Sequence, residues 1–202
     1  MSERGVEILG QELCYQGFYR MERITLRHRL FAGGMSPPIT REVIEKGDVA
    51  AALLYDPKRD EVVMIEQFRV GARDDPRGPW LVEIVAGLIE PGETPEEVAR
   101  REAMEEAGCT VTDLLPVTTF YVSPAKTSQR THLFCGRVDS SRAGGIHGLA
   151  HEGEDIRVVC MPSEDALALV EQGRADSAWP LIALLWFARH RPALRQRWLG
   201  RG

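Results

Sequence analysis

The chain has 202 residues, of which 44% are hydrophobic, and it carries a formal net charge of -5 at pH 7. This length suffices for one domain with a sizeable core and a small extra subdomain. The negative balance argues against nucleic acid or an acidic membrane as partner, because both are bound by basic surfaces. No apolar run resembles a signal peptide or is long enough to span a bilayer, so we expect no membrane partner and a cytoplasmic location.

The cysteines support the same compartment. They are Cys14, Cys109, Cys135 and Cys160. None forms a C-x-x-C pair, so neither a zinc site nor a redox motif is indicated. Scattered thiols of this kind suit a reducing cytoplasm, where cysteine usually serves as a small buried apolar residue.

The N-terminal part of the chain predicts a small antiparallel sheet. Residues 6–31 alternate apolar and charged positions in short runs. Two prolines then make residues 35–40 a turn or linker, because proline cannot complete a strand ladder. We therefore divide the chain into a β subdomain at residues 1–45 and a larger domain at residues 46–202.

The larger domain mixes strands with a few helices. Strands are expected at residues 48–56, 61–68, 80–87, 114–122, 131–138 and 155–161. Helices are expected from Ser163 to the glycine at 173 and over residues 177–191, the latter apolar nearly all round and hence buried. The pattern predicts an α/β (α+β) layered domain. The polar stretch at 139–154 is long for a loop in a compact domain, which indicates either disorder or function.

Local signals predict a helix from Thr94 to Ala107. Thr94 suits the N-cap, proline follows at the first helical position, and Glu97 completes a capping box. Gly108 can adopt the left-handed conformation that ends a helix. The small apolar face of this helix is formed by Val98, Ala99, Ala103 and Ala107.

This helix carries an unusual density of carboxylates. Glu102 and Glu106 are four residues apart and therefore lie one above the other beside the apolar face. A solvated acidic surface is the simplest interpretation of a charge run. However, a glycine-punctuated loop leaving a buried strand leads directly into the helix, and hard oxygen ligands clustered at a sheet rim suit Mg²⁺ or Mn²⁺.

The stretch resembles the Nudix box, the signature of hydrolases that split nucleoside diphosphates linked to another group. At the fixed positions of that motif this chain has Gly87, Glu93, Arg101, Glu102, Ala103, Glu105, Glu106, Gly108 and Cys109. The small Ala103 and the thiol of Cys109 stand where larger aliphatic residues are more usual. The resemblance implies a Nudix α/β/α sandwich with a mixed sheet, in which Glu93 braces the loop and Arg101 orients carboxylates.

The resemblance also implies a metal site and a catalytic base. Glu102, Glu106 and the backbone oxygen of Ala86 would bind Mg²⁺, with Mn²⁺ as a possible substitute and Glu154 as a further ligand. Glu152 would take a proton from the attacking water, while Glu154 and Glu105 remain alternatives for that role. By themselves the two loop glutamates are more simply interpreted as solvated acids, and the presence of the box favours the catalytic interpretation.

Within the Nudix family, the branch that hydrolyses ADP-ribose is similar to nearly the whole chain. Pro124 stands fifteen residues after Cys109, as in the substrate loop of that branch. Residues 145–158 resemble its mobile catalytic loop, and residues 15–36 resemble the sheet through which it forms a domain-swapped homodimer. The similarity implies Mg²⁺-dependent hydrolysis of ADP-ribose to AMP and ribose 5-phosphate.

Substrate-binding residues follow from the same similarity. Phe18 and Tyr19 would sandwich adenine from the partner subunit, although strand aromatics are often core residues. Arg41 and Glu42 would lie around the adenine. Arg69 would reach the phosphates, since a guanidinium suits them through its forked donors, and Leu88 would contribute a backbone contact. The alternative for each arginine is a surface salt bridge.

The loop expected at the terminal ribose departs from the usual pattern. Its residues Ser123 and Pro124 match, but Ala125 and Lys126 replace two glycines, and Gln129 replaces an acid. This leaves another nucleoside diphosphate sugar, such as ADP-glucose or GDP-mannose, as an alternative substrate. A nucleotide-sugar sensor without catalysis is a third hypothesis, disfavoured because every acid of the box is present.

Overall fold

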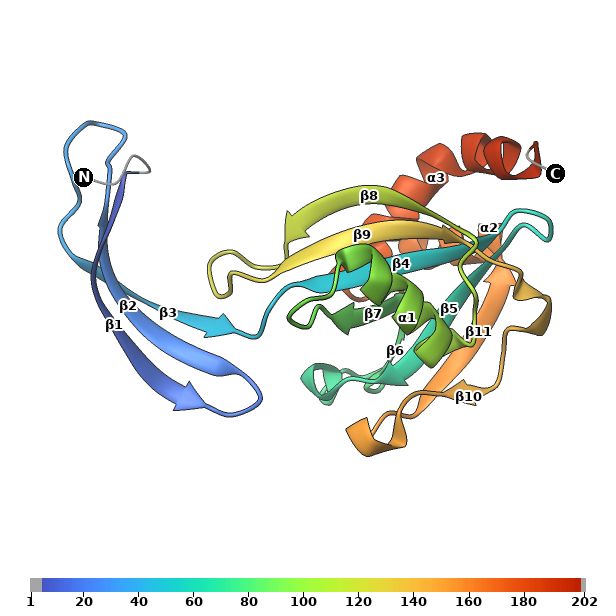
Figure 1. The fold of residues 1–202 in the computed structure, drawn as a ribbon, viewed down its shortest axis with the longest axis horizontal. Coiled ribbons are helices and arrows are strands. Elements are labelled where there is room, and N and C mark those ends of the chain that lie inside the picture. The colour runs from blue at the N-terminus through green and yellow to red at the C-terminus, as the bar shows by residue number, and fades with distance from the viewer. Residues whose placement is uncertain (1–4, 201–202) are drawn as a thin grey trace. The chain divides into compact units, whose positions relative to one another are not determined.

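The chain folds as two compact units. The computed structural model describes residues 5–200, with Glu152 described by its backbone alone. The first unit comprises Met1–Asp48 and Tyr121–Arg130, and the second comprises Val49–Phe120 and Thr131–Gly202. Figure 1 labels the elements of both.

The first unit is built on a three-stranded antiparallel sheet in the order β1-β2-β3. Its strands are β1 (Val6–Gln16), β2 (Arg20–His28) and β3 (Ile39–Glu45). The prediction of a linker over residues 35–40 was wrong at its end, because β3 begins directly after the prolines and pairs Ile39 with Leu26. This strand has little apolar alternation and is largely exposed, so its pattern gave no signal.

The second unit contains a mixed sheet in the order β10-β11-β5-β4-β9-β8, with β6 on β5 and β7 on β4. Its strands are β4 (Val49–Asp56), β5 (Glu61–Phe68), β6 (Trp80–Glu83), β7 (Val85–Leu88), β8 (Asp113–Tyr121), β9 (Arg130–Arg137), β10 (Ile146–His147) and β11 (Ile156–Pro162). The β4 and β9 strands are parallel, whereas β4 runs antiparallel to β5 and β7. This sheet confirms the predicted α/β class.

Helices cover both faces of this sheet (Figure 1). They are α1 (Pro95–Ala107), α2 (Ser163–Glu171) and α3 (Ala178–Leu199). Alternate residues of β4 face opposite layers: Ala50 and Ala52 pack in the α1 layer, whereas Leu53 and Tyr55 pack in the α2 and α3 layer. The period-two alternation of a strand thus builds two cores from one segment.

The single strand predicted at residues 80–87 is in fact two strands. The β6 strand pairs with β5, whereas β7 pairs with β4. Ile84 lies between them and is fully buried. The sequence gives no sign of this change of partner strand, because apolar residues continue on both sides of it.

The last helix is longer and less buried than predicted. It runs to Leu199 and buries one side, including Phe187 and Trp198, while Leu185 is 56% exposed. Within residues 5–200, no helix is long and apolar enough to cross a membrane.

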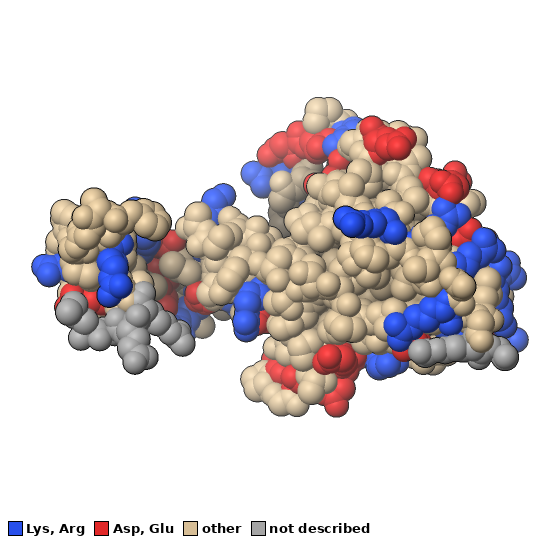
Figure 2. Space-filling view, turned by 90° about the horizontal axis from the view of Figure 1, so that it is seen from above, with Lys and Arg blue, Asp and Glu red and all other residues tan. Residues whose placement is uncertain are grey.

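Charges of both signs are mixed over the face drawn in Figure 2. Several charged side chains of the protein form local pairs, for example Arg77 with Asp176 at 2.8 Å and Arg130 with Asp48 at 2.8 Å. Exposed pairs of this kind contribute little to stability individually.

A polar hub at Asp60 joins the β4–β5 turn to the two C-terminal helices. Its carboxylate accepts hydrogen bonds from Tyr55 Oη at 2.8 Å, Ser163 Oγ at 3.1 Å and Arg191 Nε at 2.9 Å. Arg195 adds an ion pair at 3.2 Å. The hydrogen bond from Arg191 is the largest cause that lowers the Asp60 pKa, to about 2, against the opposing effect of burial.

We predict that Asp60→Asn lowers the free energy of unfolding by about 2 kcal/mol at pH 7. Asparagine tolerates the left-handed backbone of this position (φ 58°), so the loss reports the charge. Because the folded-state pKa lies below the unfolded one, the carboxylate stabilises above about pH 4, and this stabilisation is lost as pH falls toward 2. Urea denaturation at several pH values measures the difference.

The matched control is Asp74→Asn, since Asp74 is exposed and forms an ion pair with the exposed Arg73 at 3.3 Å. Its unfolding curve should follow the unmodified protein at every pH. If the difference in unfolding free energy between Asp60→Asn and the unmodified protein did not change with pH, the stabilising role of the Asp60 charge would be contradicted.

Candidate active site

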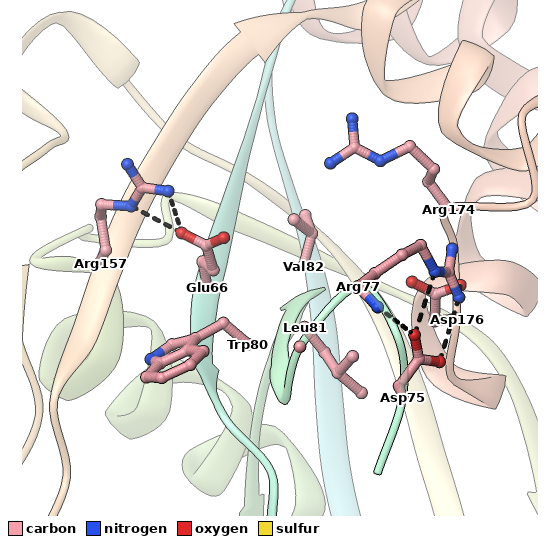
Figure 3. A pocket seen from close by; sticks show the side chains of 10 residues that line it. Glu66, Asp75, Arg77, Trp80, Leu81, Val82, Arg157, Arg174 and Asp176 are labelled. Atoms are coloured by element: carbon pink, nitrogen blue, oxygen red, sulfur yellow. Dashed lines mark hydrogen bonds and ion pairs between the residues drawn. The ribbon is translucent and has the colours of Figure 1, made fainter. Parts of the chain in front are cut away.

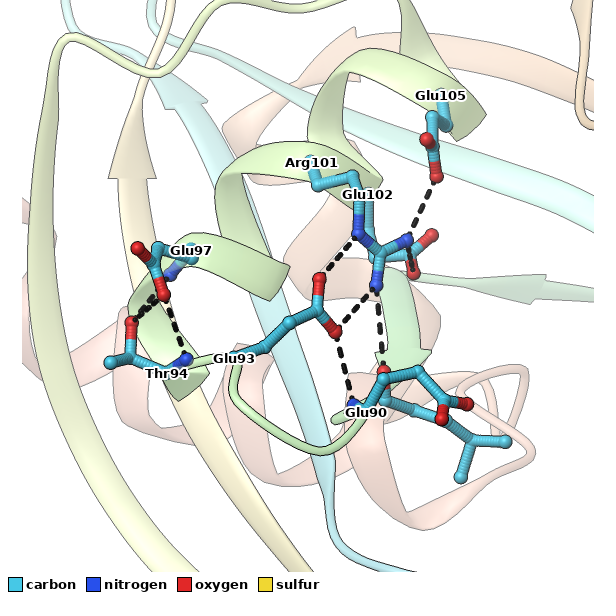
Figure 4. A network of polar contacts seen from close by, with 8 residues as sticks. Glu90, Glu93, Thr94, Glu97, Arg101, Glu102 and Glu105 are labelled. Carbon is cyan, nitrogen blue, oxygen red and sulfur yellow. Dashed lines mark hydrogen bonds and ion pairs between the residues drawn. The ribbon is translucent and has the colours of Figure 1, made fainter.

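The helix α1 begins and ends at the residues that the sequence predicts. The Thr94 hydroxyl accepts from the Glu97 N–H at 3.3 Å, and the Glu97 carboxylate accepts from the Thr94 N–H at 2.8 Å. Pro95 opens the helix, and Gly108 ends it at φ 63°. The capping box is seen at the left of Figure 4.

Arg101 connects the acids of this helix with the loop before it (Figure 4). Its guanidinium donates to Glu93 at 3.1 Å, to Glu102 at 2.7 Å and to Glu105 at 2.9 Å. A further contact reaches the Leu88 carbonyl at 3.5 Å. One cation therefore fixes three carboxylates that would otherwise repel each other.

Glu93 holds the loop against the helix. Its other oxygen accepts from the Glu90 N–H at 3.0 Å. The hydrogen bond from Arg101, and then that from Glu90, keeps the Glu93 pKa below its usual value. The loop is thereby tied to the helix at a carboxylate that stays ionised.

Glu106 is the most buried acid of the box. It accepts from the Ala86 N–H at 2.9 Å, and burial is the main cause that raises its pKa to about 9. The charges of Glu102 and Glu154 raise it further, whereas the Ala86 N–H and the charge of Arg69 lower it. The pKa of Glu102 is raised as well, chiefly by burial.

This surplus of carboxylates fits a divalent cation. The Glu102 carboxylate fills the space above Gly87, where an added Cβ would lie 1.7 Å from Oε1, so the loop and the acid are fitted to each other. Oxygen donors of this type suit Mg²⁺ and Mn²⁺. Among the described side chains, no three His, Cys, Asp or Glu residues are already gathered as a complete ligand set.

Arg69 is held near the cluster by a residue that the sequence analysis missed. Its Nε donates to Glu83 at 2.7 Å, and the other oxygen of Glu83 accepts from Ser177 Oγ at 2.9 Å. Glu83 is only 3% exposed. A carboxylate within the otherwise apolar run at residues 80–87 was the available signal.

The stretch at 139–154 is ordered into short elements rather than disordered. They are the single helical turns Ser140–Arg142 and Ala150–Glu152 on either side of β10. The Glu154 carboxylate accepts from the Leu149 N–H at 3.0 Å. The predicted base Glu152 has its backbone here, but its side chain lies outside the described part of the chain.

Within the first unit, the predicted adenine residues are exposed rather than packed in a core. Phe18 and Tyr19 follow β1, are 66% and 51% exposed, and contact each other edge-to-face at 5.0 Å. Lys46 Nζ lies 4.0 Å from the Phe18 ring centre. On β3, Arg41 and Glu42 are exposed, and Glu42 is 3.4 Å from an arginine of β2.

The loop from Ser123 to Gln129 belongs to this same first unit. The Ser123 carbonyl accepts from the N–H groups of Lys126 and Thr127, and the Lys126 carbonyl accepts from Ile44 on β3. Pro124 and Ala125 lie within this turn. Gln129 Nε2 donates to the Gly47 carbonyl at 2.9 Å.

A hollow of about 380 Å³ lies on the side of the sheet opposite to α1 (Figure 3). Glu66 alternates with Ile65, which packs in the α1 layer, so Glu66 points toward α2 and α3. The charged side chains that line the hollow are largely paired: Arg157 donates to Glu66 at 2.7 Å, and Arg77 forms ion pairs with two aspartates. The hollow is therefore separate from the carboxylate cluster.

Comparison with known proteins agrees with this geometry. The NUDIX domain family matches residues 45–185. The chain is 50% identical to the ADP-ribose pyrophosphatase of Escherichia coli strain K12 over 193 residues, covering 96% of this chain and 92% of the relative. The ADP-ribose pyrophosphatase of Haemophilus influenzae is 44% identical over 200 residues, covering 98% and 92%.

Two further relatives extend the comparison. The GDP-mannose pyrophosphatase of Cronobacter sakazakii is 41% identical over 192 residues, covering 89% of this chain and 93% of the relative. A crystal structure of an ADP compounds hydrolase matches with a TM-score of 0.69 over 100% of this chain and 98% of that one, at 21% identity. At that identity the match shows the fold alone. With the family match and the full-length relatives together, the chain belongs to the Nudix family and is a Nudix hydrolase.

Proposed function

We propose that this protein hydrolyses the pyrophosphate bond of ADP-ribose in a Mg²⁺-dependent reaction, giving AMP and ribose 5-phosphate. The observation that carries the proposal is the 50% identity, over 96% of the chain, to a relative named for that substrate. The buried carboxylates of α1, whose negative charge the fold offsets only in part, supply the physical reason for a metal.

The cation would be held by Glu102, Glu106, Glu154 and the backbone oxygen of Ala86. When bound, Mg²⁺ or Mn²⁺ supplies positive charge to the pyrophosphate oxygens and favours ionisation of the attacking water. The Ala86 N–H orients Glu106, and Arg101 orients Glu102 from the other side. These hydrogen bonds fix the carboxylates before any substrate arrives.

The remaining groups would position substrate and move the proton. Arg69, anchored by Glu83, would bind a phosphate oxygen with the donors that this ion pair leaves available. Glu152 would accept the proton of the attacking water. Its competitors for that role are already engaged, since Glu105 accepts from Arg101 and Glu154 accepts from the Leu149 N–H.

The first unit would bind the two ends of the substrate. Phe18 and Tyr19 present exposed rings for adenine, and Arg41 and Glu42 lie on β3 of the same unit. Ser123, Pro124, Ala125 and Gln129 would lie at the ribose, and Leu88 near the metal. Exposed Leu13, Tyr15 and other apolar side chains of β1 favour coverage by a second subunit, as in a domain-swapped homodimer.

The alternative substrate is another nucleoside diphosphate sugar. It is favoured by the 41% identity to a GDP-mannose pyrophosphatase and by Lys126 and Gln129 in the ribose loop. The pyrophosphate chemistry would be unchanged, because it depends on the second unit. A reducing, cytoplasmic setting suits the four free cysteines.

The first test measures AMP release from ADP-ribose, with ADP-glucose and GDP-mannose assayed in parallel for their nucleoside monophosphates, with and without Mg²⁺. We expect the highest kcat/KM for ADP-ribose and loss of turnover on chelation. A higher value for GDP-mannose would identify the alternative. No turnover of any of them would overturn the enzymatic proposal for these substrates.

The second test is Glu106→Gln, which should lower kcat by about 100-fold or more because a charged metal ligand becomes neutral. Without metal, the stability of the variant relative to the unmodified protein should increase progressively from about pH 4 to about pH 9, because the unfolded carboxyl ionises over this range and the folded one does not. A carboxyl whose folded-state pKa is raised contributes stability that is fully present below its unfolded pKa and is lost as pH rises toward the folded-state pKa. Thermal unfolding with and without Mg²⁺ checks this.

Mg²⁺ should raise the melting temperature of the unmodified protein and raise that of Glu106→Gln less. Glu96→Gln is the matched control, since Glu96 is exposed in the first turn of the same helix. Equal stabilisation of all three proteins by Mg²⁺ would remove Glu106 from the ligand set.

The third test assigns the base. Glu152→Gln should lower kcat by about 100-fold, within the usual range for general-base catalysis, and leave KM and stabilisation by Mg²⁺ unchanged. Glu105→Gln should lower kcat less, because that carboxylate is held by Arg101. The opposite ranking would move the role to Glu105.

A further inference from the structure

The segment that carries Glu152 and Glu154 is attached to the C-terminal end of α1. The Gly148 N–H donates to the Glu105 carbonyl at 3.3 Å, which joins this segment to the last turn of the helix. Gly148 has a φ of 97°, and an added Cβ would lie 2.7 Å from Cβ of Glu154. The segment and its acid are therefore closely packed at this point.

His147 makes the neighbouring contact with its ring. A Cβ on Gly108 would lie 2.7 Å from Cε1 of His147, so the imidazole occupies the space over the end of the helix. Gly108 is thus constrained twice, by its left-handed φ of 63° and by the ring above it. The short β10 strand fixes the backbone of His147 opposite Ile156 on β11.

The ring is oriented from its other side. His147 Nε2 lies 2.9 Å from the Gly144 carbonyl. A carbonyl oxygen only accepts, so Nε2 carries the proton and donates. The imidazole therefore bridges the start of the segment and the end of the helix.

We propose that His147 is a positioning residue, which clamps residues 144–154 to the end of α1 and so sets the place of the loop carboxylates relative to Glu102 and Glu106. The inference rests on the proposed hydrolysis, because it assigns the loop acids a part in it. Glu154 belongs to the clamped segment, because its carboxylate accepts from the Leu149 N–H at 3.0 Å, next to the Gly148 N–H that donates to the last turn of α1.

The chain offers a matched pair of glycines to test the clamp. Gly108 and Gly173 share a φ of 63° and follow helices α1 and α2, but nothing lies within 4 Å of a Cβ placed on Gly173. Alanine at either position carries the same backbone strain, roughly 1 kcal/mol. Only alanine at position 108 meets the His147 ring.

We expect Gly108→Ala to lower kcat for ADP-ribose by about tenfold or more, as small displacements of catalytic groups do. Gly173→Ala should leave kcat unchanged. His147→Ala should lower kcat as well, and adding Gly108→Ala to it should cost almost nothing more. His147→Gln, whose amide N–H can donate to Gly144, should restore much of the rate.

Hydrogen exchange gives a readout that needs no activity. Peptides covering residues 144–154 should exchange faster in Gly108→Ala and His147→Ala, while Gly173→Ala leaves them unchanged. If Gly108→Ala does not fold, the kcat and the exchange rates of His147→Ala and His147→Gln still test the role of His147.

Additive losses of kcat in the double variant, or unchanged exchange in His147→Ala, would overturn the clamp. The kcat outcome presupposes turnover by the unmodified protein, whereas the exchange outcome does not, so failure of the clamp is distinguishable from failure of the proposed function. Exchange that responds as expected in a protein inactive on nucleotide sugars would support the clamp and reject the hydrolysis.

Discussion

The constraint on which the site depends is the repulsion among carboxylates held in low dielectric at the end of α1. Burial disfavours a charge at Glu106, and the neighbouring acids disfavour it further. The fold offsets this negative charge only in part. Arg101 donates hydrogen bonds to Glu102 and Glu105, and Glu106 accepts one from the Ala86 N–H. A helix built for stability alone would place these acids in solvent, so their burial indicates a site that a cation completes.

The layer beneath the helix explains how the acids come to be buried. Ala50 and Ala52 of β4 face Ala99 and Ala103 of α1, all fully buried. Small residues on both surfaces let helix and sheet approach closely, so the acids flanking this face are drawn down with it. The small Ala103, where the family often has a larger aliphatic residue, belongs to this packing.

The features that the sequence predicted involve residues close together in the chain, whereas those that it missed join distant segments. The capping box of α1 and its glycine stop depend on residues three or four apart, and both are as predicted. Contacts between distant segments gave no such signal: Glu83 with Arg69, Gln129 with Gly47, and His147 with Gly108. Their partners are chosen by strand pairing and loop docking, which no local pattern encodes. The roles assigned to the substrate-binding residues remain predictions from family resemblance.

The same distinction applies to the residues at 123–129 that depart from the family pattern. An acid at position 129 could not donate to the Gly47 carbonyl, whereas the Gln129 amide does so at 2.9 Å. Lys126 contacts β3 through its backbone, since its carbonyl accepts a hydrogen bond from the Ile44 N–H, and its side chain takes no part in this bond. The substitutions are therefore accommodated by the first unit without the flexibility that two glycines would add. Since the carboxylate cluster lies wholly in the second unit, a change of preferred sugar requires no change in the chemistry that cleaves it.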